Sequence, residues 1–302
     1  MYQLKNYSKN QQRFITVFHT AEKVFAKISL DQGASLQELS FGKTQVIKKQ
    51  PNFEYKDSYA SSILFPFCSR IENGAYEFEG KKEVFHCNES GEKNALHGLI
   101  YNKKFDLISQ NISDNFVSIT LGYFEKIGQK GFPYKYDFYV TYTFSENGLA
   151  LQIIVKNEDE SSFPFTLGWH PYFLSDDLPN SFFQFESHQK VVFNEQLIAK
   201  GVTDLQTKSP FSIDNHQFDD CFILNTPITV FKTPTYDLTL NSNSKEHFLQ
   251  IYTPKGLPIV AIEPMTGISN SFNNQIGLQV LAPAKIYSIT WNLSINQKNE
   301  SL

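Results

Sequence analysis

The chain has 302 residues, with 28 Phe and 15 Tyr against only 2 Met, and a formal net charge of −4. Lys and Arg are scattered without a basic excess, which argues against nucleic acid as a partner. Aromatic residues suit the half-buried surface of a sheet better than a helix, so the composition favours an all-β chain.

Segments in which apolar and polar residues alternate recur along the chain, and this period of two is typical of strands with one buried face. The clearest segments are residues 24–30, 116–121, 138–144, 149–155 and 249–252. The turn-rich residues 145–148 separate the third segment from the fourth, which predicts a hairpin. Neighbouring strands joined by tight turns predict an antiparallel sheet.

Long helical patterns are hard to find, and the best candidates are short pieces at residues 58–64 and 195–199. A doubly wound α/β fold is therefore disfavoured, and no glycine-rich loop predicts a nucleotide site. No linker divides the strand pattern. We expect a single domain over residues 1–302, folded as a large antiparallel β-sandwich with few short helices, because one open sheet of so many strands would split.

The N-terminal sequence lacks the apolar core of a signal peptide, and no run of about 18 apolar residues could span a bilayer. We therefore expect a cytoplasmic protein without a membrane partner. Cys68, Cys87 and Cys221 are widely and irregularly spaced, so neither a disulfide framework nor a zinc motif is predicted.

Residues 163–173 form the most informative stretch. A strand over residues 165–170 would place Gly168 and His170 on one face, where small side chains leave room for a ligand. Pro171 would end regular pairing and put the histidine at a strand end. A satisfied core histidine is the alternative interpretation of His170.

Four more polar residues stand at element ends, each with an ordinary explanation as well. His97 lies in a loop sequence, Arg70 precedes a turn, and Asp219 lies beside Asp220 between aromatic residues. Glu263 ends an apolar strand, where a carboxylate must be either solvated or held in a polar pocket. Solvated loops and surface ion pairs would explain these residues without any function.

Together, and in this order, these segments resemble the aldose 1-epimerase (galactose mutarotase) family over nearly the whole chain. Ser-Arg-Ile-Glu-Asn-Gly at 69–74 looks like its arginine segment, and Asn-Ala-Leu-His-Gly at 94–98 like its first histidine motif. Trp-His-Pro-Tyr-Phe at 169–173 looks like the second histidine motif and is the most specific. Phe-Asp-Asp-Cys-Phe at 218–222 is similar to its aspartate motif, and Glu263 falls at the position of its catalytic glutamate.

The resemblance implies a β-sandwich enzyme that converts the anomers of a free hexose, such as galactose or glucose, in an open cleft without metal or organic cofactor. Glu263 would take the proton of the anomeric hydroxyl as catalytic base, and His170 would protonate the ring oxygen as catalytic acid. A histidine pKa near ~6.5 suits that acid at neutral pH. Arg70, His97 and Asp219 would bind the sugar hydroxyls.

Departures from the family pattern concern the substrate more than the reaction. Ser69 stands where many relatives have Asn, Leu99 where Gly is frequent, and Asp220 where histidine is common. The sequence Pro-Met-Thr-Gly at 264–267 looks like a shorter bacterial branch of the family.

Two other functions remain open at this point. A non-catalytic carbohydrate-binding module would use the same sandwich and cleft. A glycosidase would use Asp219 and Glu263 as its carboxylate pair, which leaves both histidines without a role. A phosphorylated hexose would need clustered Arg or Lys, yet Arg13 and Arg70 are the only arginines, so we expect a neutral sugar. The chain is expected to be a monomer or a homodimer.

Overall fold

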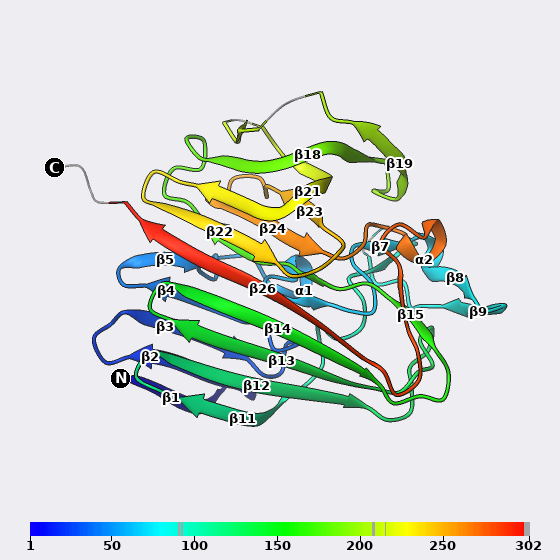
Figure 1. Cartoon of the computed structure of the whole chain (residues 1–302), viewed down its shortest axis with the longest axis horizontal. Helices are drawn as coiled ribbons and strands as arrows, with labels where there is room; N and C mark the ends of the chain where they lie inside the picture. Colours follow the sequence, from blue (N-terminus) through cyan, green and yellow to red (C-terminus); the bar gives the residue numbers. More distant parts are fainter. Residues whose placement is uncertain (90, 92, 207–208, 215, 299–302) are drawn as a thin grey trace.

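Strands make up nearly all of the regular structure. The computed structural model describes residues 1–89, 91, 93–206, 209–214 and 216–298. Its N-terminal part is an antiparallel sheet whose strands pair in chain order, drawn in blue in Figure 1. These strands are β1 (Tyr2–Lys9), β2 (Gln12–His19), β3 (Val24–Ser29), β4 (Leu36–Phe41) and β5 (Thr44–Ile47).

A larger antiparallel sheet contains most of the remaining strands. Its hydrogen-bonded order is β11 (Asp106–Ile112), β12 (Phe116–Glu125), β13 (Tyr136–Ser145), β14 (Gly148–Asn157), β26 (Ile286–Gln297), β22 (Tyr236–Ser242), β21 (Asp219–Lys232), β23 (Phe248–Tyr252), β24 (Ile259–Met265), β16 (Gly168–Trp169) and β6 (Ile63–Leu64). The C-terminal strand β26 thus joins a lower and an upper half of the sheet (Figure 1).

Short pieces complete the structure around the middle and top of the molecule. β17 (Tyr172–Leu174) pairs with β24, and β18 (Phe182–Phe193) pairs with β19 (Ala199–Asp204), β20 (Phe211–Ser212) and β21. Three two-stranded ladders join β7 (Arg70–Ile71) to β10 (Ala95–Leu96), β8 (Ala75–Phe78) to β9 (Lys81–Val84), and β15 (Phe163–Phe165) to β25 (Gln279–Leu281). The helical turns are α1 (Tyr55–Ser58), α2 (Ser271–Asn274) and the 3-10 turn Glu72–Gly74.

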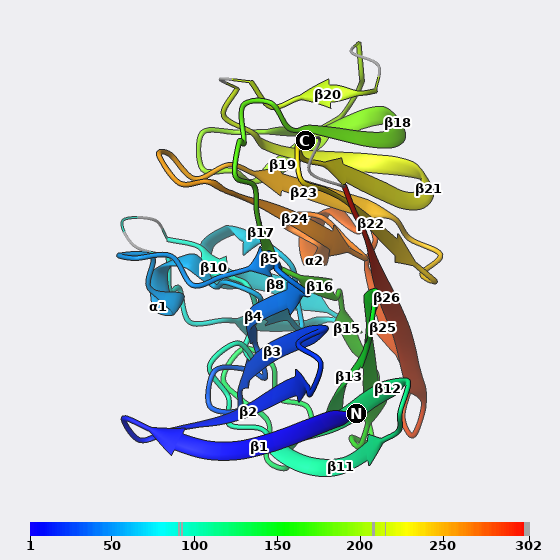
Figure 2. The same cartoon turned by 90° about the vertical axis from the view of Figure 1, so that its left-hand side faces the viewer.

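The N-terminal sheet packs face to face on the lower half of the large sheet, as Figure 2 shows from the side. Along β13 buried and half-buried residues alternate, with Phe138, Val140 and Tyr142 turned into the core. The Tyr142 hydroxyl donates a hydrogen bond to the carbonyl of Ala34 at 2.9 Å and so links the two layers. The predicted all-β sandwich is confirmed, whereas the expectation of a single domain stays a prediction.

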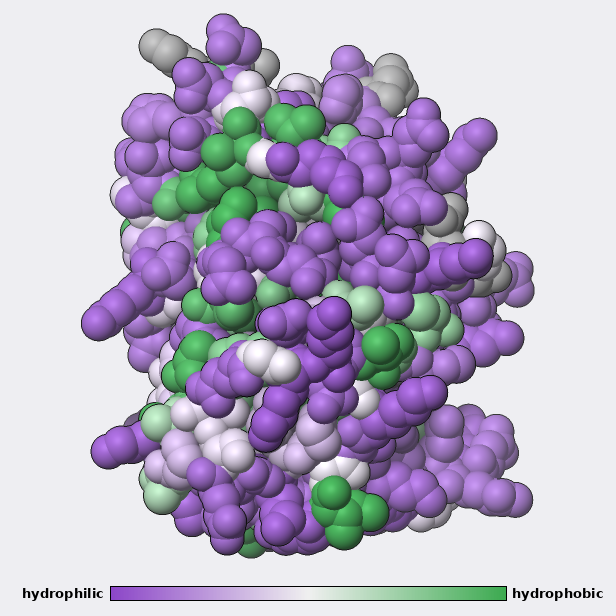
Figure 3. Space-filling model, turned by 90° about the vertical axis from the view of Figure 1, so that its right-hand side faces the viewer, coloured by the Kyte–Doolittle hydropathy of each residue, from purple (hydrophilic) through white to green (hydrophobic). Residues whose placement is uncertain are grey.

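The molecular surface is mostly polar on the face shown in Figure 3, and the apolar patches there are separated by polar side chains. None of the helices among the described residues has the length and apolar character that crossing a bilayer requires.

The alternating segments of the sequence lie in β3, β12, β13, β14 and β23 as predicted, and β13 and β14 form the expected hairpin with Ser145 opposite Gly148. Both predicted helical pieces are wrong. Residues 194–198 form the turn between β18 and β19, in which the Asn194 side chain accepts the N–H groups of Gln196 and Ile198, and Ala199 already begins β19. Over residues 58–64, α1 ends at Ser58 because the backbone turns left-handed at Tyr59 (φ 52°).

The predicted continuous strand over residues 165–170 is also wrong. It is broken after β15 because Thr166 donates its N–H to the carbonyl of Pro66 at 2.7 Å, outside any ladder. The N–H of Leu167 then donates to the hydroxyl of Thr266 at 2.8 Å. One hydrogen bond to a loop carbonyl and one to a side-chain hydroxyl therefore replace strand pairing just before the histidine segment.

A close backbone contact fixes the loop that contains His97. Gly98 forms an isolated parallel bridge with Phe65, and the N–H of Leu99 donates to the Phe65 carbonyl at 2.7 Å. A Cβ at Gly98, where φ is 76°, would lie 2.2 Å from that carbonyl oxygen. Only glycine permits this approach.

We expect Gly98→Ala to lower the free energy of unfolding by about 2–4 kcal/mol, because the left-handed backbone and the overlap with Phe65 both penalise a side chain. Gly80→Ala is a matched control, since Gly80 has φ 75° but no atom within 4 Å of the added Cβ. That control should cost only about 1 kcal/mol. Chemical denaturation of both variants measures the difference, and equal losses would contradict the packing argument.

Candidate active site

A cavity of about 220 Å³ opens where the upper half of the large sheet meets the loops around α1, β7 and β10. It brings together all five residues singled out in the sequence: Arg70, His97, His170, Asp219 and Glu263. A larger hollow of about 370 Å³ adjoins it across Tyr172 but contains none of the five. The cavity is also lined by Asp57, Ser58, Tyr59, Ser69, Leu96, Tyr172, Gln250 and Tyr252.

Strand register places the two carboxylates of the cavity. Glu263 lies on β24 directly opposite Gln250 of β23, and Asp219 at the start of β21 lies opposite Tyr252. The start of β21 is fixed just before Asp219, because Phe218 donates its N–H to the Thr253 hydroxyl at 2.8 Å and accepts the Thr253 N–H at 3.0 Å.

Asp219 and its neighbour Asp220 point to opposite sides of β21. Asp219 is exposed at the cavity and accepts a hydrogen bond from Gln250 Nε2 at 2.8 Å. Asp220 instead pairs with Lys190 Nζ at 3.2 Å on the other side of the sheet. The residue at the position where histidine is common in the family therefore does not line this cavity.

His170 is held between β16 and β17 by its own backbone. Its N–H donates to the Ser62 carbonyl at 3.0 Å, and its carbonyl accepts the Ser61 N–H at 2.7 Å. The imidazole stacks on Tyr172 with ring centroids 5.0 Å apart and meets the His97 ring edge to face, also at 5.0 Å. Its Nε2 lies 3.4 Å from Glu263 Oε1.

The expectation that the Gly168 face leaves room for a ligand is wrong. A Cβ at Gly168 would lie 2.8 Å from Cys68 Sγ and 3.1 Å from Met265 Cγ, so this glycine serves close packing of the sheet. Thr166 is fully buried, and its hydroxyl accepts the Cys68 N–H at 3.0 Å. The cavity begins only at His170.

Burial controls the ionisation of the central pair. It raises the pKa of Glu263 well above its usual range, an effect that Asp219 increases and Arg70 partly opposes. Burial also lowers the pKa of His170 to about 3. The unperturbed histidine pKa assumed from the sequence therefore does not apply, and the neutral forms of both groups are favoured.

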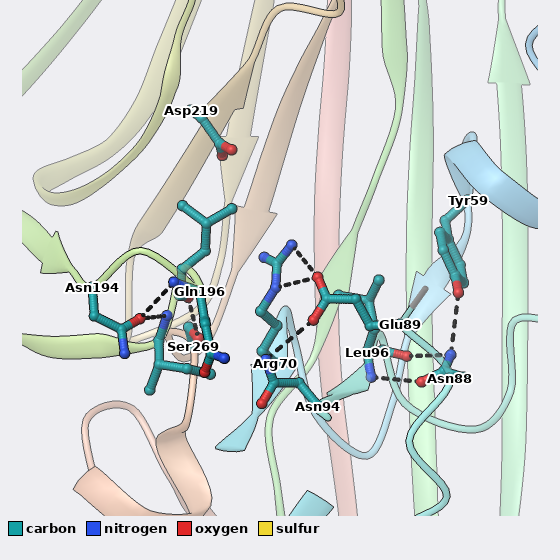
Figure 4. A network of polar contacts seen from close by, with 12 residues as sticks. Tyr59, Arg70, Asn88, Glu89, Asn94, Leu96, Asn194, Gln196, Asp219 and Ser269 are labelled. Atoms are coloured by element: carbon teal, nitrogen blue, oxygen red, sulfur yellow. Dashed lines mark hydrogen bonds and ion pairs between the residues drawn. The ribbon is translucent and has the colours of Figure 1, made fainter. Parts of the chain in front are cut away.

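His97 and Arg70 face the cavity from the neighbouring loops. His97 is half-buried with a left-handed backbone (φ 59°), and burial, followed by the neighbouring His170 and Arg70, lowers its pKa well below the usual value. Arg70 Nε donates to Glu89 Oε1 at 2.7 Å, and Arg70 Nη2 lies 2.6 Å from the same oxygen (Figure 4).

No motif or local pattern singled out Tyr59, Gln250, Tyr252 or Glu89. Gln250 and Tyr252 line the cavity because β23 pairs with β24. No local sequence pattern predicts which strands pair. Tyr172 lies two positions after His170 within the second histidine motif, and this spacing is the signal from which its contact with His170 could have been predicted. The described residues contain no group of three or more His, Cys, Asp or Glu side chains that could bind a metal ion.

Comparison with known proteins gives the family. A sequence model described as aldose 1-epimerase matches residues 16–294. This chain belongs to the aldose 1-epimerase family. It is therefore an isomerase by family, and the resemblance proposed from the five motifs is confirmed.

Relatives of the family are similar along most of their length. The uncharacterized protein YihR of Escherichia coli K12 is 26% identical over 274 residues, covering 86% of this chain and 87% of that protein. An aldose 1-epimerase of Haemophilus influenzae is 25% identical over 235 residues, covering 68% of this chain and 66% of that protein.

Solved structures show the same fold at lower identity. A galactose mutarotase-like protein of Clostridium acetobutylicum superposes with a TM-score of 0.83 at 18% identity, covering 98% of this chain and 99% of that one. The galactose 1-epimerase of Lactobacillus acidophilus superposes with a TM-score of 0.82 at 14% identity, covering 99% of both chains.

The raised pKa of Glu263 predicts a pH-dependent stability. A carboxyl whose folded-state pKa exceeds its unfolded value stabilises the fold at low pH, and this contribution is lost as the pH rises through the folded-state pKa. We therefore expect Glu263→Gln, which cannot ionise, to be more stable than the unmodified chain at pH 8 by at least about 1 kcal/mol. The gain should shrink at pH 5.

Urea denaturation at both pH values measures this difference. Glu146→Gln serves as the control, because Glu146 is an exposed carboxylate paired with Lys23 and should show no comparable gain. A Glu263→Gln variant that is less stable than the unmodified chain at pH 8 would contradict the burial argument.

Proposed function

We propose that the chain is an aldose 1-epimerase that interconverts the α and β anomers of a neutral free hexose such as galactose or glucose. The observation that carries this proposal is the contact between Glu263 and His170, a buried carboxyl and a buried imidazole 3.4 Å apart in the cavity. Opening a hemiacetal needs one proton removed and one supplied at neighbouring oxygens, and such a pair can do both.

In the proposed first step, the Glu263 carboxylate takes the proton of the anomeric hydroxyl while protonated His170 donates to the ring oxygen. The bond between C1 and the ring oxygen breaks as the C1 carbonyl forms, giving the open-chain aldehyde. Rotation about the C1–C2 bond then presents the other carbonyl face. Reclosure with both proton transfers reversed yields the other anomer and restores the pair.

The two pKa shifts support these roles for the ionised form of the pair. A carboxylate with a raised pKa is a stronger base towards a hydroxyl, and an imidazolium with a lowered pKa is a stronger acid towards the ring oxygen. A pair that holds one proton can reach this reactive form by transfer within the pair.

We further propose that Arg70, His97 and Asp219 bind the sugar hydroxyls and so align the two proton transfers. Arg70 uses Nε and Nη2 for Glu89, which leaves Nη1 without a protein partner among the described residues. Asp219 accepts one hydrogen bond from Gln250 and keeps lone pairs for a hydroxyl.

The charge of the cavity supports a neutral sugar over a phosphorylated one. Besides Glu263, whose neutral form is favoured, the acidic residues Asp57 and Asp219 line it, against the single lining cation Arg70, whose charge Glu89 already offsets. A phosphate dianion would meet a net negative surface there, whereas hydroxyl groups can bind to carboxylates as donors.

Polarimetry of freshly dissolved α-D-glucose and α-D-galactose tests the proposal. We expect the chain to accelerate the equilibration of at least one of them, and Glu263→Ala and His170→Asn each to lower the rate constant kcat by about 10²–10⁴-fold. Asp219→Asn should raise KM, while Asp220→Asn should leave both constants unchanged because Asp220 pairs with Lys190 outside the cavity.

Two results would count against the proposal. If the chain binds either sugar but does not accelerate its equilibration, it is not a mutarotase for that sugar and acts on it as a binding protein. If Glu263→Ala keeps full activity, the assigned base is wrong.

A further inference from the structure

We propose that the adjacent residues Asn88 and Glu89 are positioning residues, Asn88 for the imidazole of His97 and Glu89 for the guanidinium of Arg70. Neither residue lines the cavity, and Figure 4 shows Glu89 bonded to Arg70 and Asn88 bonded to Leu96 and Tyr59, which do line it. This inference rests on the proposed function, in which His97 and Arg70 bind the sugar.

Glu89 fixes Arg70 by a short, partly buried ion pair. One carboxylate oxygen accepts Nε at 2.7 Å and lies 2.6 Å from Nη2, and the other accepts Asn94 Nδ2 at 3.2 Å. The side chains of Arg70 and Glu89 are 18% and 12% exposed, so water replaces this pair poorly. Because two of the three guanidinium nitrogens are engaged, Glu89 determines where the third one lies.

Asn88 fixes the peptide that precedes His97. Its Oδ1 accepts the N–H of Leu96 at 2.8 Å, and its Nδ2 donates to the carbonyl of the same residue at 3.1 Å. His97 follows directly with a left-handed backbone, which a residue other than glycine adopts at a cost and keeps only when its surroundings enforce it. The two hydrogen bonds between the Asn88 side chain and the Leu96 backbone enforce this conformation.

Asn88 also acts on the His97 ring through Tyr59. Besides the Leu96 carbonyl, the hydroxyls of Tyr59 at 3.1 Å and Tyr101 at 3.3 Å lie within hydrogen-bonding distance of its Nδ2, and its two hydrogens are shared among these acceptors. The Tyr59 ring contacts the His97 ring with centroids 4.8 Å apart. The His97 ring in turn contacts the His170 ring, so a displaced His97 also loosens the proposed acid.

The two neighbours therefore predict different kinetic effects. Loss of Glu89 frees a binding group only, so we expect Glu89→Ala to raise KM about tenfold with kcat changed less than about twofold. Loss of Asn88 disturbs His170 through His97, so Asn88→Ala should lower kcat about tenfold. Asn88→Asp, which keeps the acceptor for Leu96 N–H, should recover part of kcat, and Glu89→Gln part of KM.

Matched controls separate positioning from general loss of stability. Asp31 binds Arg13 as Glu89 binds Arg70, with Nε donating at 2.9 Å and Nη2 at 2.8 Å from the same oxygen, but outside the cavity. The side chain of Asn243 accepts the N–H of Thr290 at 2.8 Å, also outside the cavity. Asp31→Ala and Asn243→Ala should leave kcat and KM unchanged.

NMR of the sugar-free protein tests the inference without activity. Arg13 and Arg70 are the only arginines, so the two Nε–H signals can be assigned by the Asp31→Ala and Glu89→Ala variants themselves. Glu89→Ala should shift the Arg70 signal and leave the His97 imidazole signals in place. Asn88→Ala should shift the imidazole signals of His97 and His170 and leave the Arg70 signal in place.

Failure of this inference is distinguishable from failure of the proposed function. If the unmodified chain accelerates no sugar but the NMR signals shift as expected, the proposed function is wrong and the positioning roles stand. If the chain is active and Glu89→Ala and Asn88→Ala leave KM, kcat and the NMR signals unchanged, the positioning roles are wrong.

Discussion

The buried contact between Glu263 and His170 is the constraint on which the surrounding structure depends. A carboxyl removed from water strongly prefers its neutral form, and an imidazole removed from water does the same. Keeping the two groups 3.4 Å apart therefore requires a rigid backbone around each of them. Glu263 is held by β24, which pairs with β23 on one side and with β16 and β17 on the other. His170 is held by its backbone hydrogen bonds to Ser61 and Ser62.

The same constraint explains why so much of the polar network lies one layer behind the cavity. Under the proposed function, residues that line the cavity keep donors and acceptors available for sugar hydroxyls, so they cannot use all of them for bonds to each other. Asn88 and Glu89 take the remaining bonds and hold their partners in place. Fixed orientation of this kind is what the proposed reaction, with its two coordinated proton transfers, needs.

Much of the fold and the main site residues could be predicted from the sequence, because they follow from local patterns. Period-two alternation identified β13 and β14, and the family motifs contained all five candidate site residues. Contacts between distant segments could not be read in this way. Gly168 packs on Cys68, a residue 100 positions earlier, so its role as a packing glycine has no local sign. The pKa of His170 likewise depends on burial by several elements, and the value assumed from the sequence was too high.

The hydrogen bonds between Phe218 and Thr253 have a consequence for how this architecture can vary. They fix the register of β21 immediately before Asp219. The loop that leads into the strand therefore does not determine which side of the sheet the Asp219 carboxylate faces. In a strand, a slip by one position would exchange Asp219 with Asp220 and turn the cavity carboxylate to the opposite side. Because the anchor prevents this slip, the preceding loop can gain or lose residues during evolution while the Asp219 carboxylate stays on the cavity side of the sheet.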